Sequence, residues 1–373
     1  LLEKQRAARV NAERSKVKFS HIAEDVIELK RPGWTSPKSR PQWRNTLKTY
    51  VYPQFVPPLQ GAFFMAKFRS NIWRRQRMEG SIDLSFESVV DMNKLPSTEG
   101  RGWLASDLSQ EDWTVKLNHT ALEEIASMVN QLKRNPLPTL LLRPEQFEIP
   151  ELSRAYQKAK DICDTGTGFA VIDQLPIDQY EIEDMVDVYW TLGYLMGQNV
   201  AQKWDGTMIY DVTDTGKKYG YGVRGSATNV ELGFHTDNAF GISVPDYVGL
   251  MCKYPAKEGG LSRFCSLHTV HWRMEKKYPS ELMRLYKPVY FDRQAEHDVG
   301  KEKTSFAPMF SWKDDKLRCR ANSSLVRKGY QVGGIEMDTQ LKDALEAIDE
   351  VSQSPDLWIE APLSRGEVQY LNN

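Results

Sequence analysis

The chain has 373 residues, of which 40% are hydrophobic and 27% are charged, an ordinary composition for a globular protein. No apolar run approaches the roughly 20 residues of a membrane-spanning helix, and four scattered cysteines give no disulfide framework, so we expect a cytoplasmic protein. The net charge of −1 hides an asymmetry: residues 1–80 carry 17 Lys and Arg against 6 Asp and Glu (net +11), and residues 81–373 carry 32 against 44 (net −12). Segments of opposite charge suggest two origins or two roles.

The first 80 residues are predicted to form basic helices and a linker. Apolar residues at helical spacing run through residues 1–30, and a cluster of Pro and Gly then breaks the pattern. We therefore expect a basic helical segment over residues 1–60, a linker over 61–80 and a separate domain over 81–373.

Part of this basic segment resembles another protein family. The "PGW" turn at 32–34, "QW" at 42–43 and "TLKTYVYP" at 46–53 are similar to the N-terminal core-binding region of phage-type tyrosine recombinases, over about residues 1–55. The resemblance implies a helical appendage that contacts the DNA backbone, and the charge of +11 suits weak, salt-dependent DNA contact by residues 1–80. No recombinase catalytic domain is recognisable in the chain, so a fused remnant is the alternative.

The remaining chain is predicted to begin with helices and to continue with short strands. Helices are expected over residues 119–134, 151–164, 182–197 and 338–353, and a turn followed by a strand over 165–176. Further short strands are expected over 206–212, 229–235, 247–254, 262–267, 287–291, 316–321 and 366–371. This order indicates an α+β fold with a β-sandwich or barrel core.

The stretch "ELGFHTDNAF" (231–240) places His235 two positions before Asp237. In a strand, residues i and i+2 project to the same side, so the imidazole and the carboxylate would point at one place. These are two of the three ligands in the two-histidine, one-carboxylate triad that holds non-haem Fe(II). The alternative is an ordinary histidine beside a turn aspartate, because an H-x-D pair alone is a weak signal.

The surrounding residues make the iron interpretation more specific. The chain from 233 to 271 has H-T-D followed by an aromatic residue, then "PDYVGLMC", then "AKEGGLSRFCS" with glycines at 259 and 260. Over about residues 150–373 it resembles the TauD/TfdA-like Fe(II)- and 2-oxoglutarate-dependent dioxygenases. The resemblance implies a double-stranded β-helix (jelly-roll) core with flanking helices, and Fe(II), 2-oxoglutarate and O2 as cofactor and cosubstrates.

The resemblance also implies roles for individual residues. His235 and Asp237 match the first two iron ligands, and Ser262 matches a hydroxyl that binds the 2-oxoglutarate carboxylate. For Ser262, a strand serine bonded to the backbone is the equal alternative. Three polar residues are candidates for contact with the substrate, or for simple solvation: Tyr221, Arg224 and Asn238.

The sequence departs from the family at its end. The family's third ligand is a histidine just after "NN", followed about ten residues later by an arginine for the far carboxylate of 2-oxoglutarate, whereas the sequence stops at Asn373. His268, His271 and His297 are not well placed to substitute. We therefore expect that the sequence is truncated before the second iron histidine, and that this chain alone is inactive because its site is incomplete.

The stretch "CSLHTVH" (265–271) offers a competing metal pattern. With Cys252 it gives C-x12-C-x2-H-x2-H, whereas zinc sites usually show closer cysteine pairs and wider histidine spacing. The family resemblance instead predicts a strand end and a helix start at this place.

The sequence therefore predicts an Fe(II)- and 2-oxoglutarate-dependent oxygenase that hydroxylates a small polar metabolite with release of succinate and CO2. The alternative is a catalytically dead jelly roll in a DNA-associated protein that acts through its basic N-terminal helices. Neither the substrate nor the oligomeric state follows from the sequence, because pocket residues set the substrate and the fold does not.

Overall fold

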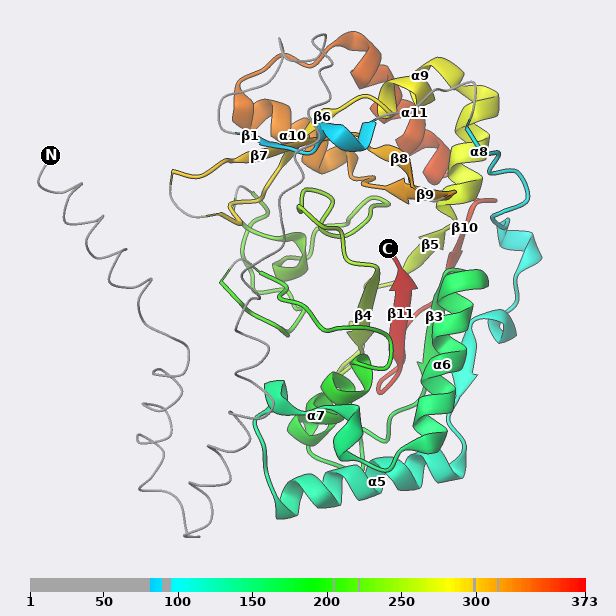
Figure 1. Ribbon diagram of the computed structural model, residues 1–373, viewed down its shortest axis with the longest axis vertical. Helices are drawn as coiled ribbons and strands as arrows, with labels where there is room; N and C mark the ends of the chain where they lie inside the picture. Colours follow the sequence, from blue (N-terminus) through cyan, green and yellow to red (C-terminus); the bar gives the residue numbers. More distant parts are fainter. Residues whose placement is uncertain (1–80, 89–94, 204, 221, 298–299, 314) are drawn as a thin grey trace, which may run out of the picture. The chain divides into compact units, whose positions relative to one another are not determined.

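The computed structural model describes residues 81–373 except 89–94, 204, 221, 298–299 and 314 (Figure 1). The chain divides into two units, residues 1–71 and 72–373, and all that follows concerns the second. The basic segment predicted over 1–60 and the linker over 61–80 lie outside the described residues. Their structure, the recombinase resemblance and the DNA contact therefore stay predictions.

A four-stranded sheet carries the C-terminal strand in its interior. The strand order is β2 (Thr114–Lys116), β3 (Phe169–Asp173), β11 (Val368–Asn372) and β4 (Tyr247–Met251). β11 pairs antiparallel with both β3 and β4, and β2 pairs parallel with β3. β11 lies between two strands, and its first three residues, Val368, Gln369 and Tyr370, are buried.

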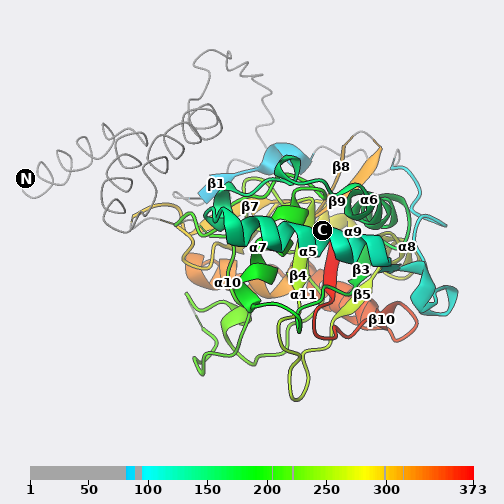
Figure 2. The same ribbon diagram turned by 90° about the horizontal axis from the view of Figure 1, so that it is seen from below.

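Three helices cover one face of this sheet (Figures 1 and 2). They are α5 (His119–Arg134), α6 (Pro150–Thr165) and α7 (Ile182–Gly193). α5 begins at the side chain of Asn118, which accepts a hydrogen bond from the Ala121 amide at 2.8 Å, and α6 begins with a proline at its first turn. One apolar cluster joins these helices to alternate residues of the sheet: Ala170, Ile172, Val368 and Tyr370.

The other half of the unit contains three smaller sheets. Their strand orders are β1 (Ser81–Asp83), β7 (Thr304–Ala307) and β6 (Val289–Asp292); β10 (Trp358–Glu360) and β5 (Arg263–Cys265); and β8 (Phe310–Lys313) and β9 (Lys316–Cys319). Short 3-10 helices occur at Ser85–Ser88, Ala105–Asp107, Gln110–Asp112, Thr139–Leu141, Pro144–Gln146 and Gly225–Ala227.

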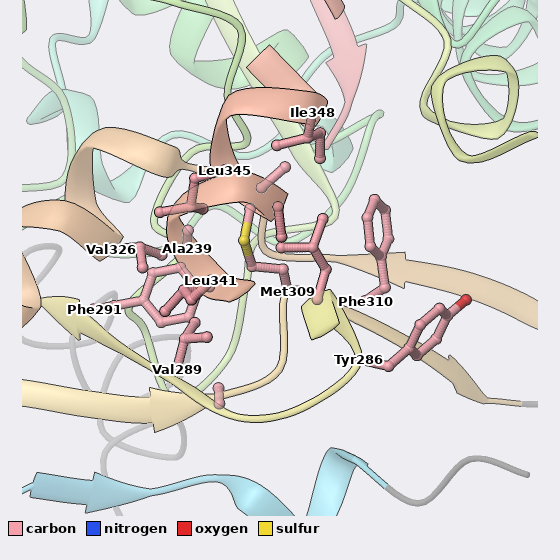
Figure 3. Close-up of a cluster of buried hydrophobic side chains, with 14 of the residues drawn as sticks. Ala239, Tyr286, Val289, Phe291, Met309, Phe310, Val326, Leu341, Leu345 and Ile348 are labelled. Carbon is pink, nitrogen blue, oxygen red and sulfur yellow. The ribbon is translucent and has the colours of Figure 1, made fainter. Parts of the chain in front are cut away.

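Four helices pack on these strands. They are α8 (Leu267–Lys277), α9 (Pro279–Leu285), α10 (Ser323–Gly333) and α11 (Thr339–Ser352). α11 inserts Leu341, Leu345 and Ile348 against Phe291 and Met309, as Figure 3 shows. This second apolar core includes Ala321, in the link between β9 and α10, which contacts the H-T-D segment described below.

The structure confirms most predicted elements and corrects others. The helices predicted over 119–134, 151–164 and 338–353 are present, as are the strands near 169, 247, 263, 289, 316 and 368. The helix predicted over 182–197 ends at Gly193, four residues early. The strands predicted over 206–212 and 229–235 were wrong, because the described residues there form irregular backbone.

The residue patterns alone predicted none of three helices after residue 260, which are α8, α9 and α10, and only the start of α8 was expected, from the family resemblance. The start of α8 at Leu267, directly after β5, matches the strand end and helix start that the family resemblance predicts there. Within the described residues, no helix is long and apolar enough to cross a membrane.

Candidate functional site

The H-T-D segment lies on an extended loop that leads into a turn, and not at a strand end as predicted. Its middle residue, Thr236, is 4% exposed, and its backbone amide donates to the carbonyl of Ala321 at 2.7 Å. The Thr236 hydroxyl donates to the same carbonyl at 3.4 Å. Because Thr236 is fixed inward, its neighbours His235 and Asp237 both project outward.

His235 and Asp237 converge on each other. The His235 Nε2 atom lies 3.4 Å from the Asp237 Oδ1 atom, and the two side chains keep 30% and 51% of their exposure. The His235 Nδ1 atom lies 2.7 Å from the Gly233 carbonyl, so Nδ1–H donates there and Nε2 faces the carboxylate. The convergence predicted for a strand therefore arises here from an extended loop.

The surroundings of His235 shift its pKa in opposing directions. Burial lowers the pKa, whereas the hydrogen bond to Asp237, its negative charge and the Gly233 carbonyl raise it. The raising contributions are larger together, and the pKa stands above the ordinary value of 6.5. Because a histidine ligand must be neutral, a proton on Nε2 competes with a metal ion for this ring.

Asn373 holds the Asp237 main chain. Its side-chain Oδ1 accepts from the Asp237 amide at 2.7 Å, and its Nδ2 donates to the carbonyls of Asp237 at 3.0 Å and Pro245 at 3.1 Å. The Asn373 amide also donates to the Asp246 carbonyl at 2.8 Å. The end of β11 is thereby fixed beside the two candidate ligands.

The donor set fits a ferrous ion in part. Two ligands about 2.1 Å from one divalent ion and at right angles would lie about 3 Å apart, close to the observed Nε2–Oδ1 distance. An imidazole nitrogen and a carboxylate oxygen are the donor types of a non-haem Fe(II) site. In the part of the chain that the structure describes, no group of three His, Cys, Asp or Glu side chains could hold a metal ion. The described residues thus offer two donor atoms of the types expected for a site with three protein ligands.

Ser262 lies immediately before β5, and its hydroxyl bonds to a side chain. The hydroxyl donates to the Gln369 Oε1 atom at 3.2 Å, while the Ser262 carbonyl accepts from the Ala361 amide at 2.9 Å. The structure therefore does not support the alternative, in which the Ser262 hydroxyl bonds to the backbone. The role of Ser262 toward 2-oxoglutarate stays a prediction.

The three predicted substrate residues have different surroundings. Arg224 forms an ion pair with Glu296, with its Nε 2.8 Å from Oε1, and it also donates to the Gln202 carbonyl at 2.9 Å. Asn238 has a positive φ of 53° and caps its own turn by donating to the Ser243 carbonyl at 3.4 Å. Tyr221 lies outside the described residues.

The competing zinc pattern does not assemble. His271 is 2% exposed, and both of its ring nitrogens have partners: Nδ1 lies 3.1 Å from the Thr98 hydroxyl and Nε2 lies 2.7 Å from the Tyr286 hydroxyl. Burial, and to a lesser degree the charge of His268, lower the pKa of His271 to about 4. His271 is therefore a neutral core histidine.

Two residues that the sequence interpretation did not single out fix the site. Asn373 is one, and Arg320 is the other. The Arg320 guanidinium is 6% exposed and donates from Nη1 to the carbonyls of Ala239 at 3.0 Å and Gly241 at 2.6 Å, which follow Asp237. No local sequence signal marks Arg320, because its partners lie far away along the chain, and Asn373 belongs to the "NN" of the family resemblance but had no role assigned.

Known proteins resemble this chain over most of the second unit. The family model "Taurine catabolism dioxygenase TauD, TfdA family" matches residues 133–373. FR-33289 synthase of Streptomyces rubellomurinus (strain ATCC 31215) is 22% identical over 294 residues, which cover 76% of this chain and 84% of that protein.

Solved structures show a similar fold. A structure of asparagine oxygenase in complex with Fe(II), 2S,3S-3-hydroxyasparagine and succinate has a TM-score of 0.54 at 16% identity, and covers 70% of this chain and 85% of that one. A second structure of asparagine oxygenase has a TM-score of 0.52 at 18% identity, and covers 71% and 84%. The predicted α+β fold with a jelly-roll core is thereby confirmed. Because the family model matches more than half of the chain, the chain belongs to the TauD/TfdA family, and it is an Fe(II)- and 2-oxoglutarate-dependent dioxygenase.

Proposed function

We propose that this enzyme hydroxylates a small polar metabolite at an iron held by His235 and Asp237, with 2-oxoglutarate bound at Ser262. The observation that carries the proposal is the convergence of the His235 Nε2 and Asp237 Oδ1 atoms at 3.4 Å on an exposed rim. A structural neighbour holding Fe(II), a hydroxylated amino acid and succinate supports the same chemistry and substrate class.

Each residue has a defined task in this proposal. When bound, iron and 2-oxoglutarate supply the oxidation: 2-oxoglutarate becomes succinate and CO2, and one atom of dioxygen enters a C–H bond of the substrate. His235 presents a fixed Nε2 atom because its Nδ1–H is bonded to the Gly233 carbonyl. Asp237 presents a carboxylate whose main chain Asn373 holds in place. The Ser262 hydroxyl binds a carboxylate of the cosubstrate.

A third protein ligand completes the proposed site. Asn373 contacts the Asp237 main chain, so residues that directly follow it would lie within reach of the iron position. Reading the gene beyond the Asn373 codon tests this point. We expect a histidine within a few codons and an arginine about ten residues after it, and a stop codon directly after Asn373 would contradict it.

The proposed ligands are tested by succinate formation. The full-length protein, with Fe(II) and 2-oxoglutarate in air, is offered a panel of amino acids and other small polar metabolites. We expect His235→Ala and Asp237→Ala each to lower the rate by about 100-fold or more, because losing a ligand weakens iron binding more than losing an outer-shell partner. The control His119→Ala, whose side chain on α5 is 86% exposed, should leave the rate unchanged. Undiminished turnover in His235→Ala would refute the ligand assignment.

A further inference from the structure

A hydrogen bond joins the half-buried Ser262, immediately before β5, to the buried Gln369 in β11. Gln369 is 1% exposed, and its Oε1 atom accepts from the Ser262 hydroxyl at 3.2 Å. The Gln369 Nε2 atom is also buried, and it has no hydrogen-bond partner among the described residues. A carboxamide offers two N–H donors, and both are left unused here.

The place of Gln369 in the strand makes this arrangement costly. Side chains alternate along β11, so Gln369 and Leu371 face away from the helices that Val368 and Tyr370 contact. On the same face, the residues that pair with Gln369 are Val171 in β3 and Leu250 in β4, which are both apolar. Burying an unpaired amide among apolar neighbours destabilises the fold. An amide at this position therefore calls for a partner other than the described residues that surround it.

The orientation of the Gln369 amide determines where the Ser262 hydroxyl hydrogen points. The Ser262 hydroxyl has one hydrogen, which it now donates to the Gln369 Oε1 atom. Ser262 cannot donate the same hydrogen to a bound carboxylate. A carboxamide is nearly symmetric in shape, so a half-turn about its terminal bond replaces Oε1 with Nε2 at the same place. Nε2–H would then donate to the Ser262 oxygen and release the hydroxyl hydrogen.

We propose that Gln369 is a positioning residue that aims the Ser262 hydroxyl at the carboxylate of 2-oxoglutarate that does not bind iron. The proposal rests on the function proposed above for Ser262. In the cosubstrate complex the Gln369 amide donates to Ser262, Ser262 donates to the carboxylate, and the remaining amide hydrogen faces the same negative charge. Gln369 therefore favours 2-oxo acids with a second carboxylate over those without one.

Binding of two ligands to the protein tests this role without turnover. The full-length protein is loaded with Mn(II) and titrated by calorimetry with 2-oxoglutarate and with 2-oxopentanoate, which has the same chain but no second carboxylate. Gln369→Glu should lower the affinity for 2-oxoglutarate by about tenfold or more. A carboxylate can only accept hydrogen bonds, so it keeps the Ser262 hydroxyl hydrogen directed at itself, and its negative charge repels the ligand. The same variant should change 2-oxopentanoate affinity by less than about twofold.

Four further variants separate positioning from packing. Gln369→Met is similar in shape and keeps the test available if Gln369→Glu does not fold. It should lower the affinity for 2-oxoglutarate by about threefold or more and leave the affinity for 2-oxopentanoate unchanged. Because Gln369 acts through Ser262, the double variant Ser262→Ala/Gln369→Met should match Ser262→Ala within about twofold. The matched control is Tyr370→Phe, on the opposite face of β11, which should leave both affinities unchanged.

Other results would overturn the inference. Equal losses with both ligands, or additive losses in the double variant, would make Gln369 a packing residue only. If Ser262→Ala binds 2-oxoglutarate like the wild type, the Ser262 assignment and this inference fail together. The succinate test of His235 and Asp237 is independent of that outcome, so the two failures are distinguishable.

Discussion

Asn372 and Asn373 are neighbours with different partners at the end of β11. Asn373 bonds the main chain of Asp237, whereas the Asn372 side chain donates to the Cys163 carbonyl of α6 at 3.2 Å. Outer residues that orient a metal ligand commonly contribute 10- to 100-fold to metal affinity. The pair therefore offers a matched test of whether the Asp237 position matters.

We predict that Asn373→Ala lowers Fe(II) affinity about tenfold, because the Asp237 carboxylate loses its fixed backbone. Asn372→Ala should leave Fe(II) affinity within about twofold of the wild type, although it removes a bond of similar kind. Anaerobic titration with Fe(II) measures both. Equal affinities for the two variants would show that Asn373 does not organise the site.

Sequence reasoning found the candidate ligands and missed the residues that hold them. His235 and Asp237 stand two positions apart, so local spacing and the family resemblance indicate them together. Asn373 lies 136 positions from Asp237, and Arg320 lies 81 positions from Ala239. Such contacts arise only when strands and loops from distant parts of the chain meet, and no local pattern encodes them.

At the scale of elements, the two residues that follow β9, Arg320 and Ala321, hold the H-T-D segment and the turn after it. Arg320 donates to the carbonyls of Ala239 and Gly241, and Ala321 accepts from the Thr236 amide. We predict that Arg320→Met lowers the free energy of unfolding by about 2–3 kcal/mol, because buried carbonyls lose a charged donor. Arg318→Met, at an exposed position of β9, should lower the free energy of unfolding by about 0.5 kcal/mol or less. Chemical denaturation measures both, and similar costs would contradict the role given to Arg320.

α8 contains a histidine that links stability to pH. The pKa of His271 is about 4 in the folded protein and about 6.5 in the unfolded chain. Between these values the unfolded chain binds a proton that the folded protein does not, so stability is full above about pH 6.5 and decreases as pH falls toward 4. The expected loss is about 3 kcal/mol.

The variant His271→Gln isolates this contribution, because glutamine can bond Thr98 and Tyr286 without titrating. We expect its free energy of unfolding to fall less steeply than that of the wild type between pH 6.5 and 4.5. Protonation of carboxylates changes the stability of both proteins alike. The contribution of His271 is therefore the difference between the two slopes of unfolding free energy against pH. Parallel slopes would show that His271 does not titrate as described.

Elements with strong local patterns could be predicted, and others could not. The bounds predicted for α5 coincide with the observed His119–Arg134, because it has a capping Asn118, an apolar stripe and basic residues in its last turn. The residues of α9 and α10 lie among short β-like runs, so their pattern predicted no helix, and α8 was expected only from the family resemblance. Residues 206–212 and 229–235 have apolar residues typical of strands, but the structure gives them no ladder partner. Pairing depends on distant strands, so propensity alone overestimates it.

At the scale of the whole molecule, charge separates the first 80 residues from the rest. The predicted DNA contact rests on their net charge of +11 and on the recombinase resemblance. If it occurs, fluorescence anisotropy with duplex DNA should show binding at 50 mM salt that weakens by at least about tenfold at 200 mM, because phosphate contacts release counterions. Absence of binding at low salt would contradict the prediction and leave the oxygenase assignment intact.

The jelly-roll unit brings together residues from the middle of the chain and from its last strand to form one proposed iron site. Anomalous diffraction at the iron edge, from anaerobic crystals grown with Fe(II) and 2-oxoglutarate, locates the metal directly. We predict one strong peak about 2.1 Å from both the His235 Nε2 atom and an Asp237 carboxylate oxygen. A strong iron peak elsewhere, with these two side chains free of metal, would contradict the account.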